Sequence, residues 1–113
     1  MTELRWLDRP AEQGTTWGVP WPRGAVEPGT PFALADAGGR QVPVQSWVTA
    51  TWPDGSVKWS AHAIGAGPHA EAYRLEPGRE PAATQTPVTV ARERGELVVS
   101  TGVITWHIGG GTL

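Results

Sequence analysis

Serine and histidine side chains are the groups in this chain that could act as nucleophile or proton acceptor. The chain has three histidines and no cysteine, which excludes a thiolate nucleophile and a cysteine-ligated zinc site. No histidine lies in a His-x-x-x-His or His-Glu-x-x-His spacing, the spacing that places two zinc ligands on one helix face. Ser60, His62 and Asp54 are close enough in sequence for a triad, yet no serine lies in a Gly-x-Ser-x-Gly turn. We therefore expect no catalytic residue, no metal site and no cofactor in this chain.

Tryptophan is the second group with possible chemistry, because it supplies seven of the nine aromatic side chains. An indole ring can stack on a sugar ring or pack in a core. Trp52, Trp59 and Trp106 lie on apolar faces of the expected strands, so we expect them in the core. Trp47 has polar neighbours and Trp21 lies between prolines, and both fit a core less well. For these two, sugar stacking and core or inter-domain packing remain open alternatives.

Composition limits the class of protein. The chain has 9 Lys and Arg against 11 Asp and Glu, a net charge of −2, which argues against a nucleic-acid partner or an anionic membrane surface. No apolar run approaches the roughly 20 residues needed to span a membrane. The N-terminus lacks the apolar segment of a secretory signal, so we expect a cytoplasmic protein. A length of 113 residues predicts a single domain over residues 1–113.

The fold class follows from 15 glycines and 11 prolines, which leave no stretch suited to a long helix. Short runs rich in Val, Thr, Trp and Ile lie between them and predict strands. The two clearest runs flank Pro53-Asp54-Gly55, a turn sequence, and predict a β-hairpin. Further strands are expected at residues 4–7, 32–35, 70–75, 88–91, 97–101 and 103–108. About eight short strands with turn residues between them predict an all-β, small barrel-like domain.

Two registers are open for the hairpin. A two-residue Asp54-Gly55 turn sets Trp52 opposite Val57 and Ala50 opposite Trp59. A three-residue loop with a glycine bulge brings Trp47 onto the side of Trp59 instead. We prefer the first register because it joins the apolar residues of both strands into one stripe. In the second strand, alternation then places Ser60 and His62 on a solvated face.

Two loops and the chain end carry further expectations. Residues 79–86 are expected to form a mobile loop, and Gly102 is expected at a tight turn or bulge. Residues 109–113 follow directly on the last expected strand. We therefore expect the chain to be truncated at its C-terminus.

Three segments together resemble a known family. They are Gly-Val-Pro-Trp-Pro-Arg-Gly at 18–24, Val-Pro-Val-Gln-Ser-Trp at 42–47 and Trp-Pro-Asp-Gly-Ser-Val-Lys-Trp at 52–59. In this order and spacing they resemble the N-terminal RIFT-barrel domain of bacterial and fungal exo-rhamnogalacturonan lyase-like proteins. The resemblance covers residues 14–64, and the last of the three segments is its most specific part.

The resemblance implies a longer parent protein whose downstream α/α toroid carries the β-elimination site that cleaves rhamnogalacturonan. No catalytic residue can be carried over to this chain. It implies a non-catalytic domain that packs against that helical catalytic domain, with a pectic oligosaccharide as a possible ligand. The substrate-binding candidates are Trp21, Arg23 and Trp47, where Arg23 could hold a galacturonate carboxylate or form a salt bridge to a neighbouring domain. The alternative is an independent carbohydrate-binding module that uses exposed tryptophans.

Overall fold

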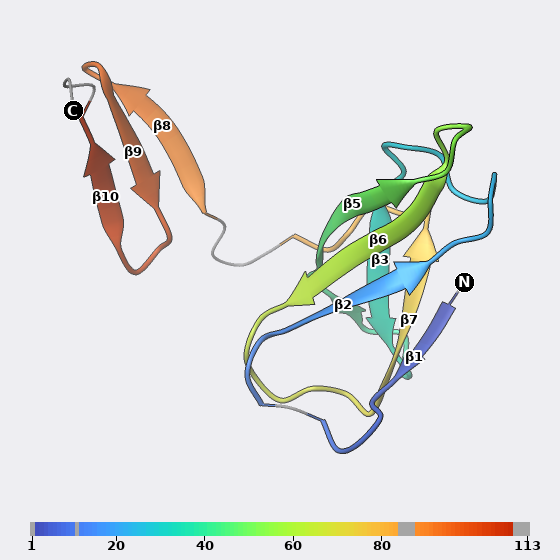
Figure 1. The fold of residues 1–113 in the computed structure, drawn as a ribbon. Helices are drawn as coiled ribbons and strands as arrows, with labels where there is room; N and C mark the ends of the chain where they lie inside the picture. The colour runs from blue at the N-terminus through green and yellow to red at the C-terminus, as the bar shows by residue number, and fades with distance from the viewer. Residues whose placement is uncertain (1, 11, 84–87, 110–113) are drawn as a thin grey trace. The chain divides into compact units, whose positions relative to one another are not determined.

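The computed structural model describes residues 2–10, 12–83 and 88–109. Over these residues the chain forms ten β-strands and no helix, which confirms the all-β prediction. No helix in the described part is therefore long and apolar enough to cross a membrane. The chain divides into two compact units, residues 1–82 and residues 83–113, and each is described by itself (Figure 1).

The first unit consists of two antiparallel sheets. In one sheet the strands lie in the order β1 (Thr2–Arg5), β7 (Ala72–Pro77), β3 (Phe32–Asp36) and β4 (Gln41–Val42). In the other the order is β2 (Thr15–Pro20), β6 (Val57–Ile64) and β5 (Gln45–Thr51). Strands from distant parts of the sequence are thus neighbours, as β1 and β7 are (Figure 1).

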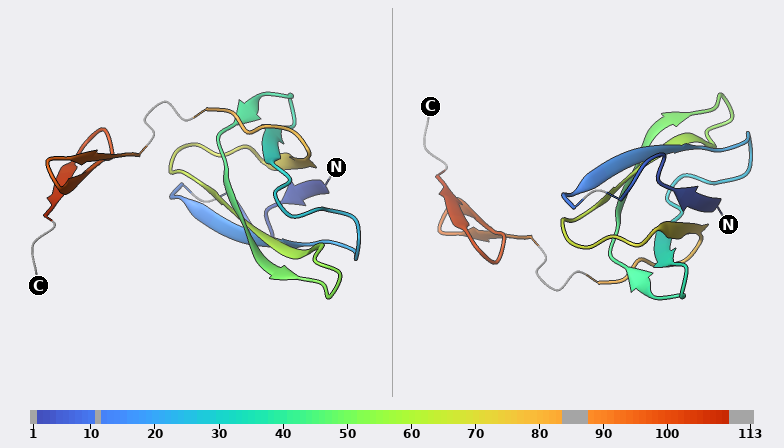
Figure 2. Two further views of the ribbon diagram at one scale, coloured as in Figure 1. Left: turned by 90° about the horizontal axis from the view of Figure 1, so that it is seen from above. Right: turned by 90° about the horizontal axis from the view of Figure 1, so that it is seen from below.

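The core of this unit is shared by the two sheets, which lie face to face (Figure 2). Leu34 of β3 pairs with Leu75 of β7, and both side chains are fully buried. Side chains of β2, β6 and the loops after β2 complete the same cluster, which comprises Val19, Trp21, Val26, Phe32, Leu34, Val57, Ile64, Tyr73 and Leu75. Burial of this apolar surface is the main force that holds the two sheets together.

Strand β2 is missing from the strands that the sequence predicts. The strand pairs with β6, with Thr15 opposite Ile64 and Pro20 opposite Trp59. Proline is tolerated because β2 is an edge strand and Pro20 is its last residue. A Cβ on Gly18 would lie 3.5 Å from Cε3 of Trp59, an ordinary van der Waals distance, so the indole ring lies close to β2 at this position.

The preferred hairpin register is wrong, because the turn is a three-residue loop. The Trp52 N–H donates to the Ser56 carbonyl oxygen at 2.8 Å, and the Gly55 N–H donates to the Trp52 carbonyl oxygen at 2.8 Å. Beyond the turn, Trp47 pairs with Ala61, as the second register predicts. Ala50 does pair with Trp59, as the first register predicts, but only at this point, between two register shifts.

These register shifts change which β6 side chains point inward. A β-bulge adds a residue to one strand and redirects the side chains on either side of it. Val57, Ser60, His62 and Ile64 are all buried, whereas Trp59 is 41% exposed. The expected solvated face of Ser60 and His62 is therefore an interior face, and the expected core residue Trp59 is on the outside.

The second unit is a three-stranded antiparallel sheet in the order β10 (Thr105–Ile108), β9 (Glu96–Ser100) and β8 (Thr89–Glu93). Arg94 and Gly95 both have positive φ, as the tight turn between β8 and β9 requires. Gly102, with a φ of 86°, lies in the turn before β10, as predicted. Trp106, which the sequence predicts in the core, is 57% exposed, and that prediction is wrong for the structure described here. The expectations for residues 84–86 and for the chain end at 110–113 lie outside the described residues.

Gly55 gives a direct test of the hairpin geometry. Its φ is 90°, a conformation that costs a residue with a Cβ about 1–2 kcal/mol. Gly55→Ala should therefore lower the free energy of unfolding by about that amount, measured by urea denaturation. Gly65→Ala is the matched control, because Gly65 has no positive φ and open space around its Cα. Equal stability of the two variants would contradict this description of the turn.

Candidate functional site

A chain of hydrogen bonds between side chains crosses the interior of the first unit. Trp21 Nε1 donates to Ser60 Oγ at 2.8 Å, and Ser60 Oγ lies 2.7 Å from His62 Nε2. On the other side of the imidazole, Nδ1 lies 2.8 Å from Ser46 Oγ. Ser60 and His62 have no exposed surface and Trp21 is 9% exposed. The chain of bonds therefore joins the loop after β2 to β6 and β5 inside the core.

The donors and acceptors in this chain can be assigned from its fixed end. An indole N–H can only donate, so Ser60 Oγ accepts from Trp21. Within the described residues the Ser60 hydroxyl has one other partner, His62 Nε2. If Nε2 carried a hydrogen, the buried Ser60 O–H would have no acceptor, at a cost of about 1–3 kcal/mol. The Ser60 O–H therefore donates to Nε2, and His62 Nδ1–H donates to Ser46 Oγ.

His62 is also enclosed by aromatic rings. Phe32 meets it edge-on at 5.0 Å between ring centroids, and Trp17 lies at 5.7 Å. Burial disfavours the imidazolium form and lowers the pKa of His62 from 6.5 to about 4. His62 is therefore neutral at pH 7 and a weak base, which suits a structural hydrogen-bonding role better than proton transfer. Trp17 Nε1 is buried nearby without a hydrogen-bond partner in the described residues.

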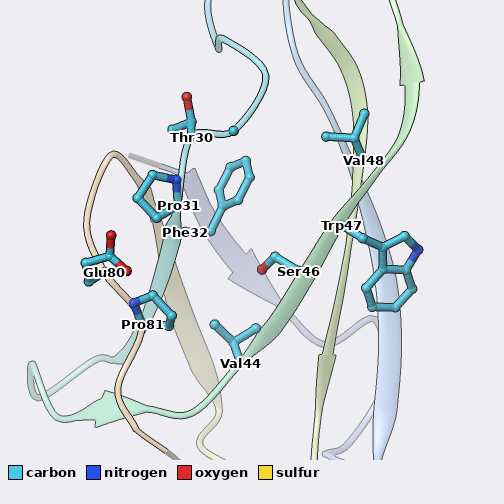
Figure 3. A pocket seen from close by; sticks show the side chains of 10 residues that line it. Thr30, Pro31, Phe32, Val44, Ser46, Trp47, Val48, Glu80 and Pro81 are labelled. Carbon is cyan, nitrogen blue, oxygen red and sulfur yellow. The ribbon is translucent and has the colours of Figure 1, made fainter.

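A cavity of about 360 Å³ opens beside Ser46, at the end of the chain of hydrogen bonds. It lies between β5 and the segments that flank β3 and follow β7 (Figure 3). The Ser46 hydroxyl points toward it, whereas the Trp47 indole points to the other side of β5 (Figure 3). Ser46 thus connects the buried chain of hydrogen bonds to the surface.

The outer face of the β2–β6–β5 sheet carries the exposed tryptophans of the first unit. Trp47 is 43% exposed and Trp59 is 41% exposed. Trp47 pairs with Ala61, which lies two residues after Trp59 on β6, and Ala61 pairs in turn with Gly18 of β2. The result is an open aromatic surface, which we call the Trp47–Trp59 face.

The structure places the three predicted site residues in different environments. Trp21 is in the core, so its ring is not available for stacking on a sugar. The indole is buried because its N–H finds a partner in Ser60. Arg23 is exposed and its Nε lies 3.4 Å from Asp54 Oδ2 in the hairpin turn. Trp47 alone presents an open ring.

The two most specific motifs of the sequence are tied together through Ser56. The Gly24 N–H donates to Ser56 Oγ at 2.9 Å, and Ser56 Oγ donates to Asp54 Oδ1 at 2.6 Å. These hydrogen bonds from Ser56, with a smaller effect of Arg23, lower the pKa of Asp54. Asp54 is therefore a turn-stabilising carboxylate. In the described residues the two ring nitrogens of His62 pair with Ser60 and Ser46 and not with Asp54, so Ser60, His62 and Asp54 form no triad.

Sequence reasoning missed Ser46 as a site residue. Ser46 belongs to the 42–47 segment that contributes to the family resemblance, but a serine next to a tryptophan does not by itself indicate a binding residue. Ser60 and His62 did offer a signal of a buried polar site. Polar side chains on a strand of a small barrel either face solvent or pair with each other in the interior, and the second possibility applies here. Within the described residues no group of three or more His, Asp or Glu side chains is arranged to hold a metal ion.

The neutral state of His62 predicts how stability depends on pH. The unfolded state binds a proton below pH 6.5 and the folded state only below about 4, so stability is full above 6.5 and falls as pH drops through this window. A difference of this size corresponds to about 3 kcal/mol of unfolding free energy. Urea denaturation at pH 7 and pH 4.5 should show the loss in the wild type and in His69→Gln, and a smaller loss in His62→Gln. An identical pH dependence in His62→Gln would contradict the assignment.

Two comparisons with known proteins agree with this architecture. Residues 1–78 match the family described as the PcRGLX-like N-terminal RIFT barrel domain, a range that contains all seven strands of the first unit. The chain is also 30% identical over 111 residues to "Uncharacterized protein YetA" of Bacillus subtilis (strain 168). That match covers 96% of the chain, and so most of the second unit, but 13% of the length of that protein.

The family match confirms the resemblance that the three sequence segments indicate and extends it on both sides of residues 14–64. It also agrees with the all-β architecture of the first unit. The chain belongs to the family of N-terminal RIFT barrel domains of rhamnogalacturonan lyase-like proteins.

Proposed function

We propose that this chain is the non-catalytic N-terminal domain of a carbohydrate-active, rhamnogalacturonan lyase-like protein, and that it packs against a helical catalytic domain of the same protein. Its family membership supports the first part. The small share of the B. subtilis relative that it matches, 13%, is in keeping with a domain of a much longer protein. On this proposal the chemistry of the whole protein belongs to the other domain.

The Trp47–Trp59 face is the observation that carries the packing proposal. Two large indoles at 43% and 41% exposure form an apolar area that water solvates poorly. Tryptophan is enriched where protein surfaces are buried against each other, because it combines a large apolar area with one hydrogen-bond donor.

The alternative is an independent carbohydrate-binding module that uses the same face. It is favoured by the partial exposure of both indole rings, Trp47 at 43% and Trp59 at 41%. Indole rings bind the C–H faces of sugars by stacking. In this alternative the ligand of the face is a pectic oligosaccharide rather than a protein domain.

Chemical oxidation of tryptophan separates the two functions. The 113-residue chain and a longer protein that contains it are treated with a dilute tryptophan oxidant, and mass spectrometry locates the modified residues. If the face packs against a catalytic domain, Trp47 and Trp59 react readily in the chain and are several-fold protected in the longer protein. Trp21, which is buried in the core, is the internal control and stays protected in both.

Equal oxidation of Trp47 and Trp59 in the two proteins would contradict the packing proposal. Protection of the same residues in the isolated chain by a pectic oligosaccharide would favour the binding module. Oxidation of Trp21 in either protein would mean that the barrel had unfolded, and that sample would be left out of the comparison.

A further inference from the structure

We propose that the cavity beside β5 binds the ring of an uncharged sugar, which accepts a hydrogen bond from Ser46 and donates one to Glu80. Trp47 also lines this cavity, but its indole ring points to the other side of β5, whereas the Ser46 hydroxyl points into the cavity (Figure 3). This site does not depend on whether the Trp47–Trp59 face packs against another domain.

The hydrogen of the Ser46 hydroxyl is directed by the buried chain of hydrogen bonds. Ser46 Oγ accepts from His62 Nδ1–H, because Trp21 and Ser60 impose that direction along the chain. Within the described residues the Ser46 hydroxyl has no other partner, so its hydrogen is not used inside the barrel. It is free to donate to an oxygen atom in the cavity, so the site is built for a ligand with an acceptor at this point.

The other cavity walls complete an amphipathic site. Pro31, Phe32, Val44 and Pro81 supply apolar surface, and Glu80 supplies a carboxylate that accepts hydrogen bonds (Figure 3). The neighbouring cation Arg79 is paired with Glu76, and Glu80 has no ion pair within the described part of the chain. A sugar ring matches this arrangement, since it has an apolar C–H face and hydroxyl groups that both donate and accept.

The charge of the cavity selects an uncharged sugar over a uronate. No lysine, arginine or histidine lines it, so a ligand carboxylate would have no cationic partner. It would also lie near the carboxylate of Glu80, and like charges repel in a partly desolvated site. The volume of about 360 Å³ is at the small end of ligand pockets, which suits one or two rings.

The test uses the 113-residue chain and NMR titration with simple glycosides. The probes are methyl glycosides of galactose, glucose, mannose and rhamnose, together with methyl galactosiduronate, which differs from the galactoside by its carboxylate. Each is added to about 50 mM, enough to fill a site of millimolar affinity. At least one neutral glycoside should bind saturably and more tightly than the uronate, with shifts centred on Ser46, Phe32 and Glu80.

Two variants test the assigned contacts. Ser46→Ala should weaken binding about five- to tenfold, the factor expected for one lost hydrogen bond. Glu80→Gln should narrow the preference for the neutral galactoside over its uronate, and this exposed substitution leaves the core intact. The matched control is Thr49→Val, which removes an exposed hydroxyl from the same strand outside the cavity and should bind like the wild type.

Three results would overturn the proposal. One is the absence of saturable binding for every neutral glycoside, and another is tighter binding of the uronate. The third is binding that Ser46→Ala leaves unchanged while Trp59→Ala abolishes it, which would place the sugar on the Trp47–Trp59 face. Unfolding curves of each variant, recorded beside the titrations, show that a loss of binding is not a loss of fold.

Discussion

The hydrogen-bond chain through His62 is the constraint on which the first unit depends. A buried imidazole is tolerated only if both ring nitrogens are paired, since an unpaired polar group in a core costs about as much as a hydrogen bond contributes. Ser60 and Ser46 supply those partners from β6 and β5, and Trp21 completes the pairing of Ser60. These hydrogen bonds thus fix the register of β5 against β6 and the position of the loop after β2. Phe32 of β3 packs against the imidazole.

The same constraint decides which tryptophans can contact another molecule. Trp21 is drawn into the core because its N–H is the donor that Ser60 needs. The bulges between β5 and β6 turn Trp59 outward, to the side on which Trp47 already lies. As a result β5 separates two surfaces of different character. One is an open aromatic face, and the other is a cavity with a hydroxyl group, a carboxylate and apolar walls.

Sequence reasoning could find the fold class, the hairpin and the family, because strand-forming runs, turn residues and the three motif segments are all local. It could not find β2, because the glycine and proline of this strand are typical of loops. The proline is tolerated since it is the last residue of an edge strand. It also placed Ser60 and His62 in solvent, since strict alternation assumes a regular strand. The bulge that breaks the alternation, and the mutual pairing that lets polar residues lie inside, are tertiary features with no local signature. For the same reason Ser46 was not recognised.

The nitrogen-15 NMR spectrum of the His62 ring at pH 7 tests this account most directly. The direction of the hydrogen-bond chain requires a neutral imidazole with its hydrogen on Nδ1 and a bare, pyridine-like Nε2 that accepts from Ser60. Two well-separated nitrogen shifts with the protonated-type signal on Nδ1 are the predicted result. A hydrogen on Nε2, or an imidazolium with two protonated-type signals, would contradict it. With the hydrogen on Nε2, the bare Nδ1 would accept from Ser46, and Ser46 would no longer be free to donate into the cavity.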